Sequence, residues 1–403
     1  VIRCLGYLQS INIGPGDEIV ICTKSNEKFL IAFWAAILGG IIPIPLAVGI
    51  NKDHRKKILT IANNLSNPTL ITDQKVKERL DIFNETEGEF PQLKNFIESA
   101  ITDYSSDIDG KLHEVQATNI AFIQYSSGST NEPKGVILSH ENLTSNIYAI
   151  AEGLDLKTND IGLSWMPLTH DMGLIGTHMT LFSNGLTHHI MDTDLFIRRP
   201  LMWLSKVNQY RASILTSPNF GYKHFLKAFQ RKSIDELDLS CVRLLINGAE
   251  SISLSICNDF LNTLEKYKLN PSTMFPVYGL AEATLGVSFP KAGDHFRSVS
   301  LNRKHLNIGN QCIVADPNEN SISFIQHGNA IRDCRIRIAD KNNKPLPDNH
   351  IGYIQVKGVN VSKGIYRDDI KTQDHLLDDG WLNTGDCGAI YNNGLIITGR
   401  IKE

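Results

Sequence analysis

The chain has 403 residues, which is too long for one simple core and suggests two or three packed units. Hydrophobic residues make up 42% of the sequence and charged residues 21%, as in an ordinary soluble globular protein. The formal net charge of −3 lacks the positive excess with which proteins bind nucleic acid, so a nucleic-acid-binding protein is not expected.

The seven cysteines are scattered along the chain without any C-x-x-C spacing. This pattern argues against a zinc site and against a disulfide framework, and it favours a reducing, cytoplasmic setting. The sequence shows no signal peptide and opens on Val1-Ile2-Arg3 without an initiating Met, as if it were cut from a longer protein.

The first part of the chain alternates between strand-like and helix-like segments. Short apolar runs predict buried strands, and apolar residues at helical spacing predict helices. Such alternation implies parallel sheets with crossover helices. Residues 82–115 are acidic and weakly patterned, and we expect them to include a connection to the next unit. The predicted strands are 18–22, 41–46 and 69–72, and the predicted helices are 29–38 and 52–64.

One uncharged stretch, residues 29–50, is as long as a transmembrane helix. Gly39-Gly40, Pro43 and Pro45 interrupt it, and proline and glycine break helices. A helix followed by a short strand fits this stretch better, so no membrane span is expected.

A run of hydroxyl, glycine and lysine residues follows a short apolar strand at 120–123. Glycine lets the main chain approach a ligand closely, successive backbone N–H groups form an anion-binding concavity, and lysine adds positive charge. A Walker-type loop is excluded, because here the lysine precedes the glycine and follows Pro133. The run therefore predicts a phosphate-binding loop, with a plain polar surface loop as the alternative. Its residues are Ser126, Ser127, Gly128, Ser129, Thr130 and Lys134.

This loop resembles that of the adenylate-forming enzymes, which include acyl-CoA synthetases, peptide-synthetase adenylation domains and luciferases. Their pattern is Ser/Thr-Ser/Gly-Gly-Ser/Thr-Thr-x-x-Pro-Lys-Gly, and the chain matches it over residues 126–135. The resemblance implies that the loop holds the β- and γ-phosphates of ATP. It also implies that Thr130 can assist in binding Mg²⁺.

Residues 163–176, with the sequence LSWMPLTHDMGLIG, resemble the fatty acyl-AMP ligase branch of the same family. The family carries an aromatic residue or His beside the acyl group, and His170 would lie where carboxylate and phosphate meet. A His-Asp metal site would need further spaced partners, which we do not find. That these residues simply pack the core stays open. The implied acyl-site residues are Trp165, Met166, His170, Met172, Gly173, Leu174, Ile175 and Gly176.

Two further motifs resemble the family's adenine site. A predicted strand runs into a glycine turn at 244–250, and ligands of open α/β sheets bind beyond the carboxyl ends of strands. The second motif resembles Tyr-Gly-x-x-Glu, in which Tyr278 would stack on adenine and Glu282 would hold Mg²⁺. The implied residues are Asn247, Gly248, Ala249 and Glu250, and Tyr278, Gly279, Leu280, Ala281 and Glu282.

The last part of the chain is β-rich. Residues 291–327 are polar and irregular, and we interpret them as an inserted segment of the kind that marks fatty acyl-AMP ligases; a variable surface excursion is the alternative. Alternating residues and the hairpin signals Asp379-Gly380 and Asn393-Gly394 follow. By resemblance, Asp386 takes both ribose hydroxyls and Arg400 approaches ribose and phosphate. The family's C-terminal lid with its catalytic lysine is expected to be missing.

The predicted fold class is therefore α/β. Two interleaved α/β subdomains with mostly parallel sheets are expected over 1–290, packed on a smaller distorted β-barrel subdomain over 328–399. Residues 291–327 form the inserted segment between them, and residues 400–403 form a hinge stub to the missing C-terminal domain.

The predicted reaction is activation of a fatty acid with ATP and Mg²⁺ to acyl-AMP and pyrophosphate, with His170, Lys134 and Glu282 as catalytic residues. The expected acceptor is an acyl carrier protein or a polyketide or peptide synthetase module. The alternatives are an acyl-CoA or aryl-CoA synthetase, an amino-acid adenylation domain, and a non-catalytic module that binds acyl-adenylate.

Overall fold

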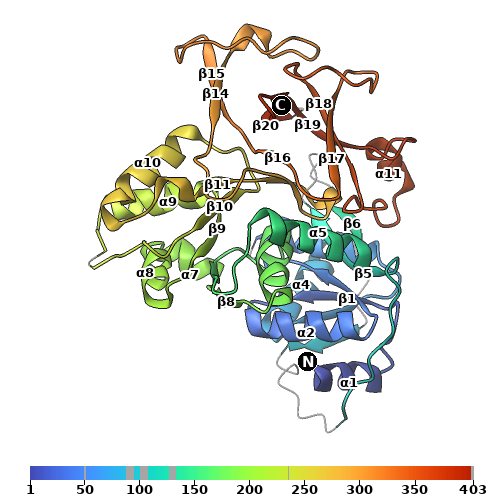
Figure 1. The fold of residues 1–403 in the computed structure, drawn as a ribbon. Helices are drawn as coiled ribbons and strands as arrows, with labels where there is room; N and C mark the ends of the chain where they lie inside the picture. Colours follow the sequence, from blue (N-terminus) through green and yellow to red (C-terminus); the bar gives the residue numbers. More distant parts are fainter. Residues whose placement is uncertain (50, 88–94, 100–107, 127–132, 235, 401–403) are drawn as a thin grey trace. The chain divides into compact units, whose positions relative to one another are not determined.

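The computed structural model describes residues 1–49, 51–87, 95–99, 108–126, 133–234 and 236–400. These residues fall into two compact units, each built from segments that are not contiguous in the sequence. The first unit comprises Val1–Leu143, Leu168–His170 and Ser362–Asp369, and the second comprises Thr144–Pro167, Asp171–Val361 and Ile370–Glu403. Figure 1 shows the elements of each, coloured along the chain.

The main sheet of the first unit is parallel, and its described strands have the order β2-β1-β3-β4. Val20 of β1 lies between Ile44 of β2 and Leu70 of β3, and all three side chains are buried in one core. The predicted strands at 18–22 and 69–72 are confirmed. The strands are β1 (Glu18–Cys22), β2 (Ile42–Pro45), β3 (Thr69–Thr72) and β4 (Asn95–Glu98).

Helices connect these strands, and polar side chains fix where two of them begin. The side-chain oxygen of Ser25 accepts a hydrogen bond from the backbone N–H of Lys28 at 3.3 Å, and that of Asn51 accepts one from His54 at 2.9 Å. The uncharged stretch thus forms a helix and then a strand, as predicted. Across the described ranges, no helix combines the length and apolar character that a bilayer span requires. The helices are α1 (Ile2–Ser10), α2 (Asn26–Leu38), α3 (Lys52–Asn63) and α4 (Gln74–Glu87).

The predicted phosphate loop joins an antiparallel pair in the same unit, β5 (Ile120–Ser126) and β6 (Lys134–Ser139). A segment from far along the chain runs beside β6: the backbone N–H of Tyr366 donates to the carbonyl of Gly135 at 2.7 Å. The hydroxyl of Tyr366 also donates to Glu18 at the start of β1. The strand pair is therefore tied both to a late segment of the chain and to the parallel sheet.

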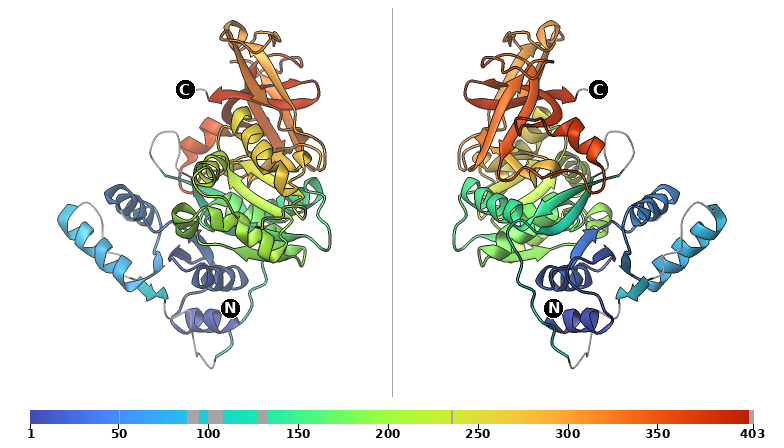
Figure 2. Two further views of the ribbon diagram at one scale, coloured as in Figure 1. Left: turned by 90° about the vertical axis from the view of Figure 1, so that its left-hand side faces the viewer. Right: turned by 90° about the vertical axis from the view of Figure 1, so that its right-hand side faces the viewer.

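The second unit contains a parallel sheet whose described strands have the order β11-β10-β9-β7-β8. Helices flank this sheet in both side views (Figure 2). Because its strands are parallel, their carboxyl ends share one edge. The predicted α/β class with mostly parallel sheets is confirmed. The strands are β7 (Ile161–Ser164), β8 (Thr187–Ile190), β9 (Ile214–Pro218), β10 (Leu244–Gly248) and β11 (Met274–Pro276); the helices of this part of the chain include α5 (His140–Gly153), α6 (Thr180–Ser183), α7 (Thr193–Arg198), α8 (Leu201–Tyr210), α9 (Asn219–Phe229) and α10 (Leu254–Leu264).

The β-rich part of the second unit holds an antiparallel sheet and two smaller ones. The segment interpreted as an insertion contributes β14 and β15, and its Val299 and Leu301 share a core with Ile351, Ala389 and Ile396. This segment is therefore anchored on the neighbouring strands. The strands are β12 (Tyr278–Gly279), β13 (Gly286–Phe289), β14 (Ser298–Asn302), β15 (Ser321–Ile325), β16 (Asn329–Ala330), β17 (Cys334–Ala339), β18 (Gly352–Gly358), β19 (Leu382–Tyr391) and β20 (Gly394–Arg400). The helix α11 (Asp369–His375) lies between β18 and β19 in the sequence.

The hairpin turn was predicted at Asn393-Gly394, but it lies one residue nearer the N-terminus, at Asn392-Asn393. Tyr391 pairs with Gly394, and the connecting residues Asn392 and Asn393 have φ of 46° and 60°. Two successive positive φ values define the turn that suits a two-residue hairpin, and Asn tolerates that conformation. Gly394 is thus the first residue of β20.

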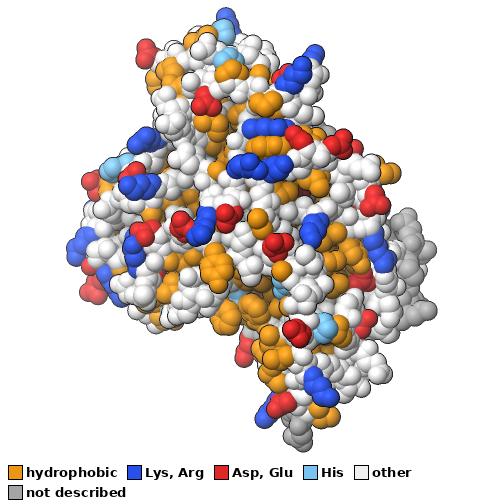
Figure 3. Space-filling view, turned by 45° about the vertical axis from the view of Figure 1, so that its right-hand side comes forward, with side chains coloured by type: hydrophobic (Ala, Val, Ile, Leu, Met, Phe, Trp, Pro, Cys, Tyr) orange, Lys and Arg blue, Asp and Glu red, His pale blue; other side chains and the backbone are white. Residues whose placement is uncertain are grey.

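Positive and negative side chains are interspersed on the face drawn in Figure 3. Arginine and aromatic side chains also stack on the antiparallel sheet, where the Arg337 guanidinium lies 4.3 Å from the centre of the Trp381 ring. Arg337 donates a hydrogen bond to Asp379 at 3.1 Å as well. This surface chemistry stabilises the sheet locally through cation–π contact and ion pairing.

Candidate functional site

The predicted phosphate loop is fixed at both ends by the β5–β6 ladder. Ser126 pairs with Lys134 in that ladder, and the Lys134 side chain is largely buried. The loop residues Ser127, Gly128, Ser129 and Thr130 lie outside the described residues. The two described residues that border the loop, Ser126 and Lys134, therefore lie opposite each other in one antiparallel strand pair.

A buried carboxylate in the second unit accepts hydrogen bonds from two predicted site residues. The Tyr278 hydroxyl donates to Asp386 Oδ2 at 2.7 Å, and Arg400 Nε donates to Asp386 Oδ1 at 2.8 Å. Asp386 is 7% exposed and Arg400 is 55% exposed at the side chain, so the pair lies at the edge of the interior. The structure therefore brings together the three residues predicted to contact adenine and ribose.

Electrostatics favour these protonation states. Burial, together with the Asp386 charge, holds the pKa of Tyr278 well above its ordinary value, so the phenol remains a hydrogen-bond donor. The Asp386 charge raises the pKa of Arg400, and the Glu282 charge adds to this effect. Each carboxylate oxygen keeps a second lone pair, so Asp386 can still accept hydrogen bonds from a ligand.

The turn after β10 has an unusual backbone at Ala249. Asn247 is fully buried at the end of the strand, whereas Ala249 and Glu250 are exposed, and Ala249 has a φ of 69°. The Glu250 carboxylate accepts a hydrogen bond from the backbone N–H of Phe220 at 2.5 Å. Glu250 thus holds the turn against the start of α9, at the edge where the parallel strands end.

Most of the predicted acyl-site residues lie on a π-helix, Met172–Met179. The hydroxyl of Thr177 donates to the Met172 carbonyl at 3.0 Å, five residues earlier, and Thr180 bonds to Ile175 in the same way at 2.8 Å. π-Helices are rare and occur frequently at functional sites.

The two glycines of this segment differ in their surroundings. A Cβ on Gly173 would meet the Pro167 carbonyl oxygen at 2.3 Å, so close backbone packing accounts for that glycine without any ligand. Among the described residues, a Cβ on Gly176 would meet the end of the Leu285 side chain, at 2.6 Å, and no backbone atom. Met172, Leu174 and Ile175 are buried, and Trp165 stacks on Phe196 with a centroid distance of 3.9 Å.

His170 belongs to the first unit with Lys134, whereas the other predicted acyl-site residues belong to the second. Gln124, which the sequence analysis did not single out, holds the backbone next to His170. Its Nε2 donates to the carbonyl of Thr169, the preceding residue, at 3.0 Å. Gln124 is 3% exposed and pairs with Val136, so it shares a face of the strand pair with Lys134, two residues before Val136. A polar residue such as Gln124 within an otherwise apolar strand is the sequence signal that could have identified it.

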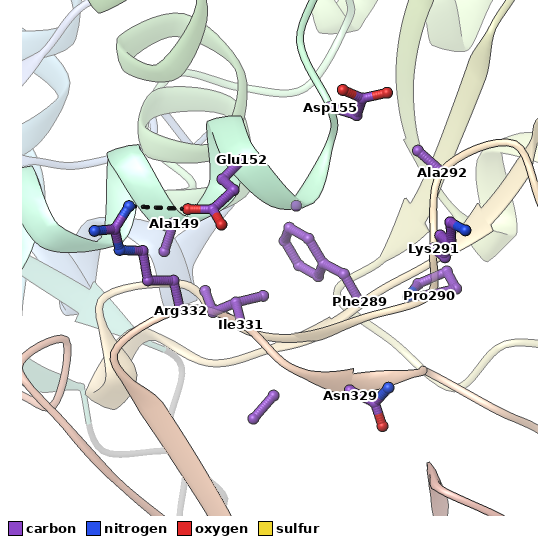
Figure 4. Close-up of a pocket in the computed structure, with 12 residues that line it drawn as sticks. Ala149, Glu152, Asp155, Phe289, Pro290, Lys291, Ala292, Asn329, Ile331 and Arg332 are labelled. Carbon is purple, nitrogen blue, oxygen red and sulfur yellow. Dashed lines mark hydrogen bonds and ion pairs between the residues drawn. The ribbon is translucent and has the colours of Figure 1, made fainter.

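A cavity of about 370 Å³ lies elsewhere in the second unit (Figure 4). The ion pair between Arg332 and Glu152, 3.1 Å long, spans one side of it, and both side chains are 63% exposed. Among the described residues that line the cavity, none is a predicted site residue. The cavity is therefore separate from the candidate site. Its lining residues include Gly153, Asp155, Phe289, Pro290, Lys291, Asn329 and Ile331.

A buried histidine, His178, and a half-buried one, His188, lie side by side in the second unit, and they predict acid sensitivity. His178 of the π-helix and His188 of β8 have ring centroids 5.9 Å apart. Burial lowers the pKa of His178 to about 4 and that of His188 to about 3. The unfolded chain takes up protons near pH 6.5, so stability is complete above that pH and is lost as the pH falls toward the folded values.

We expect His188→Leu to remove part of this acid sensitivity. Between pH 7.5 and 5.0, one such histidine costs about 2 kcal/mol of unfolding free energy, and the variant should lose that much less than the unmodified protein. Urea titrations at both pH values measure the difference. His295→Leu, at an exposed histidine, is the control; equal pH dependence in all three proteins would contradict the prediction.

Comparison with known proteins gives consistent similarities. A family model described as AMP-binding enzyme matches residues 3–366. The chain is 30% identical to a medium-chain fatty acid–acyl carrier protein ligase of Moorena producens, over 97% of this chain and 68% of that protein. It is 29% identical to a long-chain fatty acid–AMP ligase of Mycolicibacterium smegmatis, over 96% of this chain and 65% of that protein. The chain thus spans about two thirds of the length of these relatives.

The fold is also similar to that of a solved structure, a fatty acyl-adenylate ligase from L. pneumophila in complex with acyl adenylate and pyrophosphate. The TM-score is 0.87 and the sequence identity 28%, and the match covers all of this chain and 70% of that one. The similarity includes every described element of the fold, because the match runs over 100% of the chain.

Proposed function

This chain belongs to the AMP-binding enzyme family, and from that membership we propose that it activates a fatty acid as an acyl-adenylate. In the reaction a carboxylate oxygen of the fatty acid attacks the α-phosphorus of ATP. A new P–O bond forms, the bond to the β-phosphate bridging oxygen breaks, and pyrophosphate leaves with its electron pair. The products are acyl-AMP and pyrophosphate. The family match agrees with the sequence-based prediction of an adenylate-forming enzyme that resembles fatty acyl-AMP ligases.

The observation that carries this proposal is the buried Asp386 carboxylate, held between Tyr278 and Arg400. A buried carboxylate with spare lone pairs is suited to accept hydrogen bonds from the two ribose hydroxyls. The Tyr278 ring offers a planar face to adenine while its hydroxyl stays bonded to Asp386. Arg400, half exposed, can approach ribose and phosphate.

The reaction needs neutralisation of phosphate charge more than covalent chemistry from the protein. We assign the β- and γ-phosphates to Lys134 and to Ser126, Ser127, Gly128, Ser129 and Thr130. Lys134 is fixed next to the loop by its pairing with Ser126. His170 is assigned to the point where the fatty acid carboxylate meets the phosphate, and its side chain is exposed.

The residues present fit Mg²⁺ through one carboxylate. Glu282 is half buried and offers the hard oxygen ligands that this ion prefers. In the described part of the chain, no group of three or more His, Cys, Asp or Glu residues is placed to hold a metal. Mg²⁺ is commonly held by one or two carboxylates together with substrate phosphates, and Glu282, joined by Thr130, supplies such a site. When bound, the ion would neutralise charge on the phosphates.

The proposed acyl site is the π-helix with Trp165 and Met166. Its buried side chains are apolar, and burying a fatty acid chain gains about 0.8 kcal/mol per methylene without any charged contact. The relatives named for medium-chain and long-chain fatty acids support this substrate class.

We propose an acyl carrier protein as the acceptor, since one relative is named for that partner. All seven cysteines are free thiols in the structure. A reducing cytoplasm keeps thiols in this state, and we propose that the enzyme is cytoplasmic.

Product analysis by mass spectrometry tests the proposal. The full-length protein is incubated with fatty acid, ATP and Mg²⁺, alone, with coenzyme A, or with an acyl carrier protein. We expect acyl-AMP in every case and acyl transfer to the carrier protein. Formation of acyl-CoA at a comparable rate would favour an acyl-CoA synthetase, and absence of acyl-AMP under all conditions would contradict the activation reaction.

A bulky residue at position 176 should change chain-length preference. Gly176→Trp places a large ring beside the Leu285 side chain and should block a long acyl chain. We expect kcat/KM for palmitate to fall by roughly 10²-fold while that for hexanoate changes little. Gly176→Ala is the control for the loss of glycine itself. Equal effects on both acids would place the acyl chain elsewhere.

A further inference from the structure

The residue two positions after Glu282 has a strained backbone. Thr284 has φ of 66° and ψ of −58°, and the N–H of Leu285 donates to the carbonyl of Ala283 at 2.8 Å. This is a γ-turn with positive φ at a β-branched residue, a rare and unfavourable conformation. Such strain persists only where the surroundings hold it.

Buried asparagines hold this turn from two sides. Asn360, just after β18, donates through Nδ2 to the carbonyls of Ala283 and Gly286, both at 3.2 Å. The Thr284 hydroxyl donates to the backbone carbonyl of Asn360 at 2.6 Å. Asn146 of α5 exchanges two further hydrogen bonds with the backbone of Gly286, each 2.9 Å long.

These contacts counter the strain. Asn360 is 2% exposed, and Asn146 and Thr284 are fully buried, so their bonds are shielded from water. Loss of one buried hydrogen bond leaves an unsatisfied group, and that costs more than the bond itself contributes. The turn therefore depends on its asparagine partners rather than on its own sequence.

The same turn fixes the backbone of Glu282. Glu282 lies in the short helical turn Ala281–Ala283. The strained turn at Thr284 follows this segment directly. On the other side of the segment, the N–H of Leu280 donates to the Leu285 carbonyl at 3.0 Å. With both ends closed, the Glu282 backbone cannot move without breaking these bonds. Thr284 is also the point at which Asn360 holds the loop from outside.

We propose that Asn360 is a positioning residue for Glu282, whose clamp on the strained turn fixes the carboxylate for the Mg²⁺ of bound Mg·ATP. The inference rests on the proposed function, because it takes Glu282 as the metal ligand. Strained backbone is commonly kept at sites where geometry must be held closely, and a metal ligand is such a site. Asn360 reaches Glu282 only through the turn, so its effect should appear in metal dependence rather than in nucleotide recognition.

The test is Asn360→Leu in the full-length protein, which keeps the size of the side chain and removes its donors. Calorimetric titration of Mg²⁺ into the enzyme–ATP complex should show roughly tenfold weaker metal binding. The Mg²⁺ concentration for half-maximal acyl-AMP formation should rise by a similar factor. Affinity for ATP in EDTA should stay within about twofold. Thr284→Val removes one bond of the clamp and, as a milder variant, should shift the same quantities by about threefold.

A matched asparagine separates positioning from stability. Asn208 of α8 donates to the Glu236 carbonyl at 3.2 Å and accepts the Asp238 N–H at 3.1 Å. Asn208→Leu should lower the melting temperature and leave the Mg²⁺ dependence unchanged. If Asn360→Leu behaves like Asn208→Leu while Glu282→Gln weakens metal binding, the positioning role is wrong and the proposed function stands. If Glu282→Gln also keeps normal metal binding, the metal assignment itself fails.

Discussion

Replacing Asp386 with Ala should weaken ATP binding and lower kcat/KM for ATP by about 10²-fold or more. The carboxylate accepts hydrogen bonds from Tyr278 and Arg400 at 2.7 and 2.8 Å, and its removal leaves a buried phenol hydroxyl without that acceptor. Truncating one partner of a buried, hydrogen-bonded charge pair costs roughly 2–5 kcal/mol, which corresponds to this range. Calorimetry with ATP and initial-rate measurements give both quantities.

The Tyr278→Phe variant is the control, because it removes the hydroxyl and keeps the ring. If Asp386 acts on ribose, Tyr278→Phe should have a much smaller effect on ATP affinity than Asp386→Ala. The double variant then reports how strongly the two side chains are coupled. Similar small effects from all three variants would show that Asp386 serves only to hold Tyr278, and the ribose assignment would be wrong.

Buried strands were the most predictable part of the fold. The runs at 18–22 and 69–72 are short, have apolar centres and are buried throughout, so burial on both faces of a parallel sheet leaves little freedom in their limits. The strand β6 begins at Lys134, a residue assigned to the predicted phosphate loop, because pairing with Ser126 extends the ladder into polar residues. The strand at 95–98 lies within the weakly patterned stretch and gave no usable signal.

The candidate site was predictable where a motif carries it and not where backbone geometry does. Tyr278, Asp386 and Arg400 come from separate motifs, and the structure joins them in one hydrogen-bond network. The γ-turn at Thr284 could not be predicted, since a β-branched residue normally excludes positive φ. Asn360 makes its contacts with a segment more than seventy residues earlier in the chain, and no local pattern reports such contacts.

The π-helix shows the same limit. The sequence of residues 172–179 is apolar and fits an ordinary buried helix equally well. The wider hydrogen-bond spacing is supported by the hydroxyls of Thr177 and Thr180, each of which reaches a carbonyl five residues earlier. Threonine in a helix usually signals only reduced helix propensity, so these contacts become visible only in three dimensions.

Glu282→Gln should lower adenylation by roughly 10²-fold at limiting Mg²⁺. The substitution keeps the size of the side chain and removes the negative charge that suits a divalent cation, and loss of one such electrostatic contact commonly costs this much. The neighbouring charge matters too: Glu282 helps to raise the pKa of Arg400, so the variant changes the field at Asp386 as well. Initial rates of acyl-AMP formation over a range of Mg²⁺ concentrations measure the effect.

The direction of the Mg²⁺ dependence decides between two explanations of a slow Glu282→Gln enzyme. If Glu282 binds the metal, high Mg²⁺ should restore part of the rate, because mass action offsets the weaker site. If Glu282 acts only through the charge it adds near Arg400, the loss should persist at every Mg²⁺ concentration. Lys134→Ala gives the contrast, since that variant should weaken ATP binding regardless of Mg²⁺; a Glu282→Gln enzyme with unmodified rates throughout would remove Glu282 from the reaction.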